Sequence, residues 1–521
     1  MKRVDGEAFM VEEERVKLTR KLNLFDVTNI VIGAMIGADI FIAASFGANL
    51  VGPASLLVWV ASAVIIMIIA LNFAHCVTIS PLVGGPYAFA KKALGKFPGF
   101  LVGWSFWIAE WFSMAVFPVA FVKYLQYFIP LTDTEQIIVK VAFVTFLTLT
   151  NILGTKVAGK VNDILTIGRL GPLLIFIVLG LVYVVSNSSQ TIYNLTPFAP
   201  QGYSQFGGAL ILIIWAFAGF EHSTIPANEI EKPEKTIPRA IISGVLIVSI
   251  FYFAINFIIF STVSWSQLGS ISTPLTASTQ VIAGYNPYLN SILAGNTPYL
   301  SQPQIIPASW TVALLTLIVG VGALLAISGA DETGMLGTSR LGYAMALDGL
   351  FPKIFAKLHR RFKTPYIVLI IQSATALVAS ILGNLDLLIS SAVFFLALAY
   401  LVTCISSPIL HKKSSSPKAA KGFRRSLILA IAGAACCIYL LTQIKLLEII
   451  IGLILLAVGI PIYLVFSPKK ELSELRAYLS RQQILRRARE AEQVFLANLV
   501  RQIKRLYCRI RGIKQPYCKV T

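Results

Sequence analysis

The sequence predicts an all-α membrane protein with twelve transmembrane helices, and three observations support this fold class. Hydrophobic residues make up 56% of the 521 residues and charged residues only 13%, with a mean hydropathy of +0.76. Apolar runs of at least about 18 residues recur, and this is the length that a helix needs to cross a bilayer. The charges are sorted by loop, as the two sides of a membrane require. A soluble core could not bury so much apolar surface, so we expect lipid to be the solvent.

Glycine, proline and polar loops divide the apolar sequence into twelve segments. The eighth segment is longer than one crossing requires, and we expect it to continue into an interfacial stretch that holds Arg340. The predicted spans are Leu24–Leu50, Ala54–Ile79, Phe100–Ile129, Gln136–Leu153, Asn162–Ser186, Phe206–Ile230, Ile237–Val263, Pro307–Ala346, Pro365–Leu382, Leu387–Leu410, Leu427–Thr442 and Leu446–Phe466.

The net charge of +20 indicates membrane sidedness rather than a surface for nucleic acid. The region Ala240–Ala330 has no charged residue, whereas Pro468–Thr521 holds fourteen Lys and Arg against four Glu. Positive residues recur in every second loop and mark the cytoplasmic side. We therefore expect a multi-pass protein of the plasma membrane, with residues 1–23 and 467–521 in the cytoplasm. The basic tail is expected to lie on anionic lipid headgroups, and a regulatory or partner-binding role is the alternative.

Two predicted spans contain glycine and an acid near their centres, where an intact membrane helix favours leucine. Span one has Gly37 and Asp39, and span six has Gly219 and Glu221. Small residues in a span ordinarily serve helix packing, but together with charges they predict unwound backbone. Its N–H groups can hold a substrate carboxylate and its C=O groups can hold an ammonium. The substrate-binding residues predicted at these breaks are Met35, Gly37, Ala38, Asp39, Ala218 and Gly219.

The two breaks lie five spans apart, at equivalent positions of spans one to five and six to ten. This spacing is typical of an inverted repeat. We therefore expect a ten-span transport core at residues 24–410, built from inverted repeats at 24–186 and 206–410, with two additional spans at 427–466.

Four stretches of the chain match motifs that one family of permeases has in the same order. They are Ile32–Phe41 at the first break, Gly84–Gly95 at the entry to span three, Ala218–Glu221 with the exit loop Asn228–Ala240, and Ser339–Pro352 at the end of span eight. In these stretches the chain resembles the amino acid–polyamine–organocation (APC) superfamily. The resemblance implies a LeuT-like fold of five plus five inverted spans with broken helices one and six. It also implies amino acid transport by alternating access.

Ionisable residues inside predicted spans are candidates for function, because burying them in lipid costs about 2.5–3.5 kcal/mol even on a lenient scale. Five such residues are Asp39, Glu110, Arg169, Glu221 and Glu229. Many sodium-independent relatives have a lysine at the position of Arg169, where its ammonium replaces a sodium ion beside the first break. The resemblance thus implies sodium-independent transport, with the guanidinium on exposed carbonyls or on Asp39. The alternative is an arginine that snorkels to the cytoplasmic interface.

Arg169 cannot load and release a proton, because a guanidinium stays charged in proteins. We therefore expect proton coupling through Glu221, Asp39 or Glu110, with substrate exchange as the other mode. Asp39 stands where relatives usually have a glycine that receives the substrate carboxylate. Its charge would repel a carboxylate and attract an amine, so a transporter of polyamines or other organic cations is the alternative function.

Two further residues match pocket positions of the relatives. Trp215 stands where they place an aromatic gate over the substrate, and Met114 matches a pocket-lining position on span three. Packing is the ordinary role of both residue types in a membrane helix.

Other classes of function agree less well with the sequence. An intramembrane enzyme needs a nucleophile–base pair or metal ligands at depth, and the four histidines, at 75, 222, 359 and 411, lack such spacing. We therefore expect no enzyme activity, no metal and no cofactor, and a small amino acid or amine as the partner. A transporter-like nutrient sensor is the remaining alternative.

Overall fold

The structure of the chain is a computed structural model, which describes residues 22–82, 84–225, 227, 230–285, 310–413 and 417–467. The predicted basic tail beyond residue 467 and Glu229 lie outside the described residues. The chain divides into two compact units, Met1–Tyr463 and Leu464–Thr521. The helix breaks and the pocket between them belong to the first unit.

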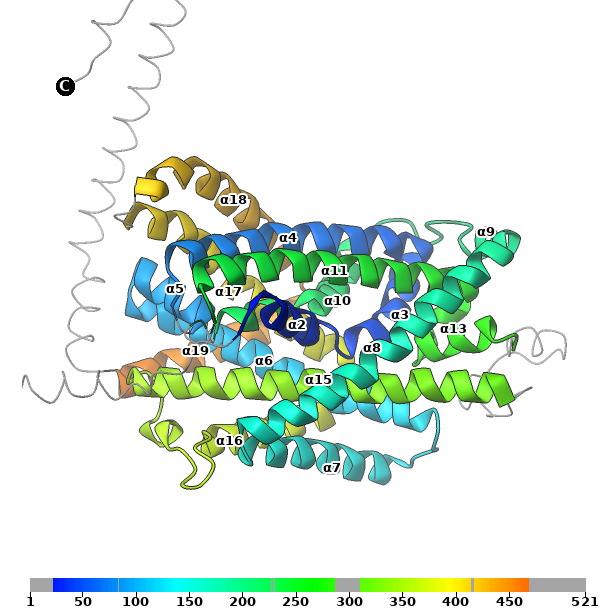
Figure 1. The fold of residues 1–521 in the computed structure, drawn as a ribbon, viewed down its shortest axis with the longest axis horizontal. Coiled ribbons are helices and arrows are strands. Elements are labelled where there is room, and N and C mark those ends of the chain that lie inside the picture. The colour runs from blue at the N-terminus through cyan, green and yellow to red at the C-terminus, as the bar shows by residue number, and fades with distance from the viewer. Residues whose placement is uncertain are drawn as a thin grey trace, which may run out of the picture. The chain divides into compact units, whose positions relative to one another are not determined.

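The described part of the chain is helical, as the sequence predicts. Figure 1 shows these helices in the colours of the chain. They are α2 (Leu24–Met35), α3 (Asp39–Val51), α4 (Ser55–Ile79), α5 (Gly85–Leu94), α6 (Lys96–Gln126), α7 (Asp133–Ile152), α8 (Thr155–Ser186), α9 (Ser188–Asn194), α10 (Phe206–Ile214), α11 (Pro233–Thr262), α12 (Trp265–Leu268), α13 (Pro274–Ile282), α15 (Trp310–Leu347), α16 (Tyr366–Leu382), α17 (Leu385–Lys413), α18 (Pro417–Thr442) and α19 (Leu446–Phe466), with the 3-10 turns η1 (Gly52–Ala54), η2 (Trp215–Phe217), η3 (Phe220–Thr224) and η4 (Lys353–Ala356).

Ten segments of the described chain are long and apolar enough to cross a membrane, whereas the sequence predicts twelve spans. The difference arises at two places. The first predicted span is divided, so α2 has only 12 residues, and α3 continues through η1 into α4 as one apolar segment, Asp39–Ile79. The ninth predicted span is α16, an apolar helix of 17 residues. The long eighth segment is a continuous helix, α15, which includes Arg340.

Long helices surround the broken ones. α4 packs along α11, and α15 packs against both α6 and α8. Figure 1 shows α4 and α11 side by side and α8 crossing α15 obliquely. The short helix α2 contacts both α11 and α15. The end of α2 is therefore enclosed by helices that are distant from it in sequence.

The first break lies between α2 and α3. α2 ends at Met35 because Ile36 is extended, with φ −77° and ψ 98°. At Gly37, a Cβ atom would come within 2.8 Å of the Ala330 Cβ atom on α15. A side chain at this position would force α15 away, so glycine permits the close approach of α15 to the break.

The second break interrupts the helix that begins with α10. After the turn η2, Ala218 is extended with φ −67° and ψ 153°, and Gly219 has a φ of +115°. This left-handed backbone favours glycine. A Cβ atom on Gly219 would lie 2.5 Å from the carbonyl oxygen of Ala34. The backbone of the second break thus packs directly on the last turn of α2.

Candidate substrate site

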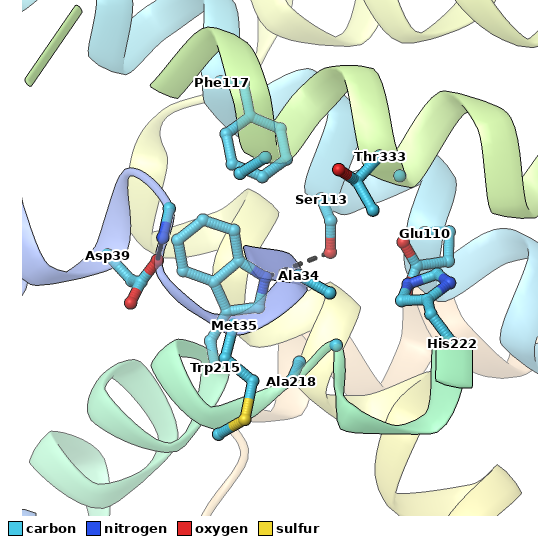
Figure 2. A pocket seen from close by; sticks show the side chains of 14 residues that line it. Ala34, Met35, Asp39, Glu110, Ser113, Phe117, Trp215, Ala218, His222 and Thr333 are labelled. Carbon is cyan, nitrogen blue, oxygen red and sulfur yellow. Dashed lines mark hydrogen bonds and ion pairs between the residues drawn. The ribbon is translucent and has the colours of Figure 1, made fainter. Parts of the chain in front are cut away.

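A pocket lies where the two breaks meet α6 and α15. In Figure 2, Asp39 lies on one side of the Trp215 indole, and Glu110 and His222 lie on the other. The residues that line the pocket are Ala34, Met35, Gly37, Asp39, Glu110, Ser113, Phe117, Trp215, Ala218, Gly219, His222, Ala330, Thr333 and Gly334.

Asp39 holds the unwound backbone of the first break. Its Oδ1 accepts a hydrogen bond from the Gly37 N–H at 3.0 Å, and the Tyr252 hydroxyl on α11 lies 2.6 Å from its Oδ2. The same hydroxyl lies 2.7 Å from the carbonyl oxygen of Met35. A hydroxyl has one proton, so Tyr252 can donate to the carboxylate or to the carbonyl group that ends α2, and it bridges both edges of the break.

Arg169, on α8, contacts the backbone of the same break. The side chain is fully buried, and its Nη1 donates a hydrogen bond to the carbonyl oxygen of Ile36 at 3.1 Å. Tyr252 and Asp39 are the titratable groups that act on it electrostatically. Gly33 makes room for the guanidinium, because a Cβ atom there would lie 2.7 Å from Nη2. Arg169 thus brings a positive charge to a carbonyl group that the break exposes.

Glu221 plays a similar part in the second break. Its Oε2 accepts a hydrogen bond from the Gly219 N–H at 3.0 Å, and the Tyr400 hydroxyl on α17 donates to Oε1 at 2.8 Å. Glu221 is fully buried and is not among the pocket-lining residues. Its carboxylate therefore faces the backbone and α17 rather than the pocket.

Glu110 and His222 form a pair at the end of the pocket opposite Asp39. Nε2 of His222, in η3, lies 3.4 Å from Oε1 of Glu110, on α6. His222 packs against α15 at Gly337, where a Cβ atom would lie 2.6 Å from Nδ1. The interrupted helix allows His222 to turn toward α6, so the pair depends on the second break.

Trp215 lies at the centre of the pocket and is held from α6. Its Nε1–H donates a hydrogen bond to Oγ of Ser113 at 3.0 Å, drawn as a dashed line in Figure 2. The indole ring lies 5.8 Å from the ring of Phe117. Of the residues predicted to line the pocket, Ala38 and Met114 are buried but are not among its lining residues.

A comparison with known proteins assigns the chain to a family. The sequence model of the family described as amino acid permease matches residues 22–447. The chain belongs to this family. It is 26% identical over 472 residues to the branched-chain amino acid permease BcaP of Bacillus subtilis (strain 168), covering 87% of this chain and 94% of the relative.

Two other relatives of the chain come from the same organism, Bacillus subtilis (strain 168). The serine/threonine exchanger SteT is 26% identical over 479 residues, covering 87% of this chain and 98% of the relative. The methylthioribose transporter is 24% identical over 485 residues, covering 89% of this chain and 97% of the relative. The family and its named members are transporters rather than enzymes, as the sequence predicts. Within the described ranges, no group of three His, Cys, Asp or Glu side chains is placed to hold a metal ion.

Seven of the residues that line the pocket were not expected from the sequence: Ala34, Ser113, Phe117, His222, Ala330, Thr333 and Gly334. Ser113 and Phe117 lie in an apolar helix, where such side chains are common. Thr333 directly follows the acids Asp331 and Glu332 on α15. His222 could have been expected at the site from its position, because it directly follows Glu221 at the second break.

Proposed function

We propose that this permease moves amino acids across the plasma membrane by alternating access. One observation carries the proposal, namely that both helix breaks line a single pocket, through Gly37 and Asp39 from one and Ala218 and Gly219 from the other. Broken helices at the centre of a transporter present N–H groups at the start of one half-helix and C=O groups at the end of another. These groups match the carboxylate and the ammonium of an amino acid.

A twelve-span topology with both termini in the cytoplasm is part of this proposal. α2 and α3 together form the first span, α4 the second and α16 the ninth. The positive loops in the sequence support this orientation. The core is two inverted five-span repeats, in which Gly37 and Gly219 occupy equivalent positions, and Trp215 moves to cover or release the substrate.

Sodium independence follows from the place of Arg169. A sodium ion would need the carbonyl oxygens at the first break, and the guanidinium already donates to that of Ile36. A fixed positive charge also makes a second cation unfavourable there. Protons remain available for coupling through Glu221, Asp39 or Glu110, and substrate exchange is the other mode.

The proposed function can be tested with the purified permease. A thermal-shift screen against amino acids and amines identifies ligands, because a ligand of the folded state raises the melting temperature. Each ligand is then offered to liposomes that contain the protein, with sodium or with choline outside. We expect uptake of at least one amino acid at equal rates in both solutions. Uptake that stops without sodium would contradict the role of Arg169, and ligand binding without any uptake would identify a sensor.

One observation favours a second candidate function, the transport of polyamines or other organic cations. Asp39 lines the pocket while its carboxylate accepts the N–H of Gly37. A substrate carboxylate would compete for this position, whereas a substrate that carries only amines would not. Competition by putrescine but not by neutral amino acids would support this candidate.

A further inference from the structure

The charges around the pocket are unevenly balanced. At the first break, Asp39 lies within the electrostatic reach of Arg169. At the opposite end, Glu110 and Glu221 act on His222, the one cationic partner found there among the described residues, and Asp331 lies close enough to act on Glu110. Even a protonated His222 would balance only one of these acids. Buried acids that exceed their cationic partners must either bind protons or be balanced by a further positive charge.

Asp331 is the acid for which the described structure supplies no partner. It lies on α15 and is completely buried, yet neither carboxylate oxygen has a hydrogen-bond partner among the described residues. The charged groups that act on it are the acids Glu332 and Glu110. Buried polar groups are nearly always hydrogen-bonded, so both oxygens of Asp331 are available to a partner that arrives from outside the chain.

Asp331 is not itself among the residues that line the pocket, but its position on α15 places it beside the Glu110 end. Residues three apart on a helix are neighbours, so Asp331 lies beside Gly334, which lines the pocket. A Cβ atom on Gly334 would meet only Oε2 of Glu110, at 3.6 Å. The Glu110 carboxylate thus lies in van der Waals reach of the turn of α15 that also holds Asp331.

We propose that Glu110 and Asp331 form an acidic subsite that binds an ammonium or guanidinium group carried by the substrate. This inference rests on the proposed function, because it takes the pocket as the substrate site. Each oxygen of the two carboxylates can accept a charge-assisted hydrogen bond from such a group. The substrate is thus a molecule with a positive charge at the end that lies opposite Asp39, either a basic amino acid or a diamine.

The neighbouring acid on α15 provides a matched control. Glu332 is also buried, but both of its carboxylate oxygens lie within hydrogen-bond distance of the Thr150 hydroxyl on α7, at 3.2 and 3.0 Å. Like Asp331, it is not among the residues that line the pocket, so the two acids differ in that only Glu332 has a hydrogen-bond partner among the described residues. Glu332→Gln therefore removes a buried acid one position away without changing the subsite.

The test compares lysine with norleucine, which has a side chain of the same carbon length without the ammonium. Binding of each to the purified permease is measured by thermal shift and by competition for uptake into liposomes. We expect the wild type to bind lysine more tightly than norleucine by at least about tenfold. Asp331→Asn and Glu110→Gln should each reduce this ratio at least about tenfold, and Glu332→Gln should leave it unchanged. Norleucine binding that persists in the variants shows that they are folded.

Cadaverine, which is lysine without the carboxylate, identifies the source of the cation. If cadaverine binds as tightly as lysine, the subsite is supported and diamines are assigned as substrates. If cadaverine binds more weakly than lysine, the subsite is supported and basic amino acids are assigned as substrates. Norleucine binding as tight as lysine binding in the wild type would overturn the subsite and leave the proposed function intact, as would a ratio that Asp331→Asn does not change. If none of lysine, norleucine and cadaverine is bound or taken up, and no other amino acid is, both the subsite and the proposed function are overturned.

Discussion

The Tyr252 hydroxyl lies 2.6 Å from Oδ2 of Asp39, although Asp39 begins α3 and Tyr252 lies on α11, 213 residues further along the chain. Tyr400 stands in the same relation to Glu221, with its hydroxyl 2.8 Å from Oε1. Each acid also accepts the N–H of a glycine two residues before it. Both breaks are therefore held by a carboxylate that joins unwound backbone to a tyrosine from a distant helix.

Removing the Tyr252 hydroxyl should weaken the first break. In Tyr252→Phe, Asp39 and the Met35 carbonyl group lose a buried donor, while the ring keeps its contacts with Trp59 and Phe217. We expect a loss of about 1–3 kcal/mol in the free energy of unfolding, seen as a lower melting temperature of the purified protein. Tyr439→Phe, on an exposed part of α18, is the control. Equal melting temperatures for the two variants would contradict the bridging role.

A methyl group at Gly33 should act on transport through Arg169. In Gly33→Ala the new Cβ atom would lie 2.7 Å from Nη2, and the flexible guanidinium would move away from the carbonyl oxygen of Ile36. We expect uptake to fall at least about tenfold, because relieving this contact displaces the charge at the break by on the order of 1 Å. Gly171→Ala on α8, where nothing lies within 4 Å of the Cβ position, should transport normally.

The opposite result has a clear meaning. If Gly33→Ala and Gly171→Ala transport equally well, the contact between Arg169 and the first break is not required for transport. Melting temperatures of both variants separate a loss of folding from a loss of activity.

Much of the fold could be predicted because lipid restricts what a spanning segment can be. Leu446–Phe466 was predicted with the bounds of α19, and Ala54–Ile79 differs from α4 by one residue. The pairs Gly37 and Asp39, and Gly219 and Glu221, predicted where the helices break. An ionisable residue inside a span is costly to bury and is therefore a candidate for function.

The remaining site residues could not be predicted because they depend on contacts between helices far apart in the chain. Tyr252 lies 213 residues from Asp39, and a tyrosine in an apolar helix is ordinary by itself. Ser113 becomes a partner of Trp215 only after α6 packs against the second break. Met114, one position further on, faces elsewhere than the pocket lining, because neighbouring residues of a helix point about 100° apart.

Neutralising Glu221 should uncouple transport from a proton gradient. An amide cannot load and release a proton, so in Glu221→Gln we expect uptake into liposomes to lose its response to an inward proton gradient, while exchange without a gradient continues. Glu231→Gln, at an exposed position after the second break, should respond as the wild type does. A full response to the gradient in Glu221→Gln would exclude this residue as the proton carrier.

Replacing Gly219 by alanine has two effects, backbone strain and a contact with the first break, and a second glycine allows them to be separated. Gly219 has φ +115° and ψ −25°, and Gly95 has φ +105° and ψ 179°, so Gly→Ala strains the backbone at both positions, and at Gly95 at least as much, on the order of 1–3 kcal/mol. At Gly95 nothing lies within 4 Å of the Cβ position, whereas at Gly219 the Ala34 carbonyl oxygen lies at 2.5 Å. Because that neighbour is backbone, Gly219→Ala must push the two breaks apart.

We therefore expect Gly95→Ala to lower the melting temperature modestly and to keep transport. Gly219→Ala should lose substrate binding in the thermal-shift assay, and its melting temperature should fall further than that of Gly95→Ala. Because the backbone strain at Gly95 is at least as large, a larger loss in Gly219→Ala reports the contact between the breaks. Binding that survives in Gly219→Ala would show that the pocket does not depend on the second break lying against α2.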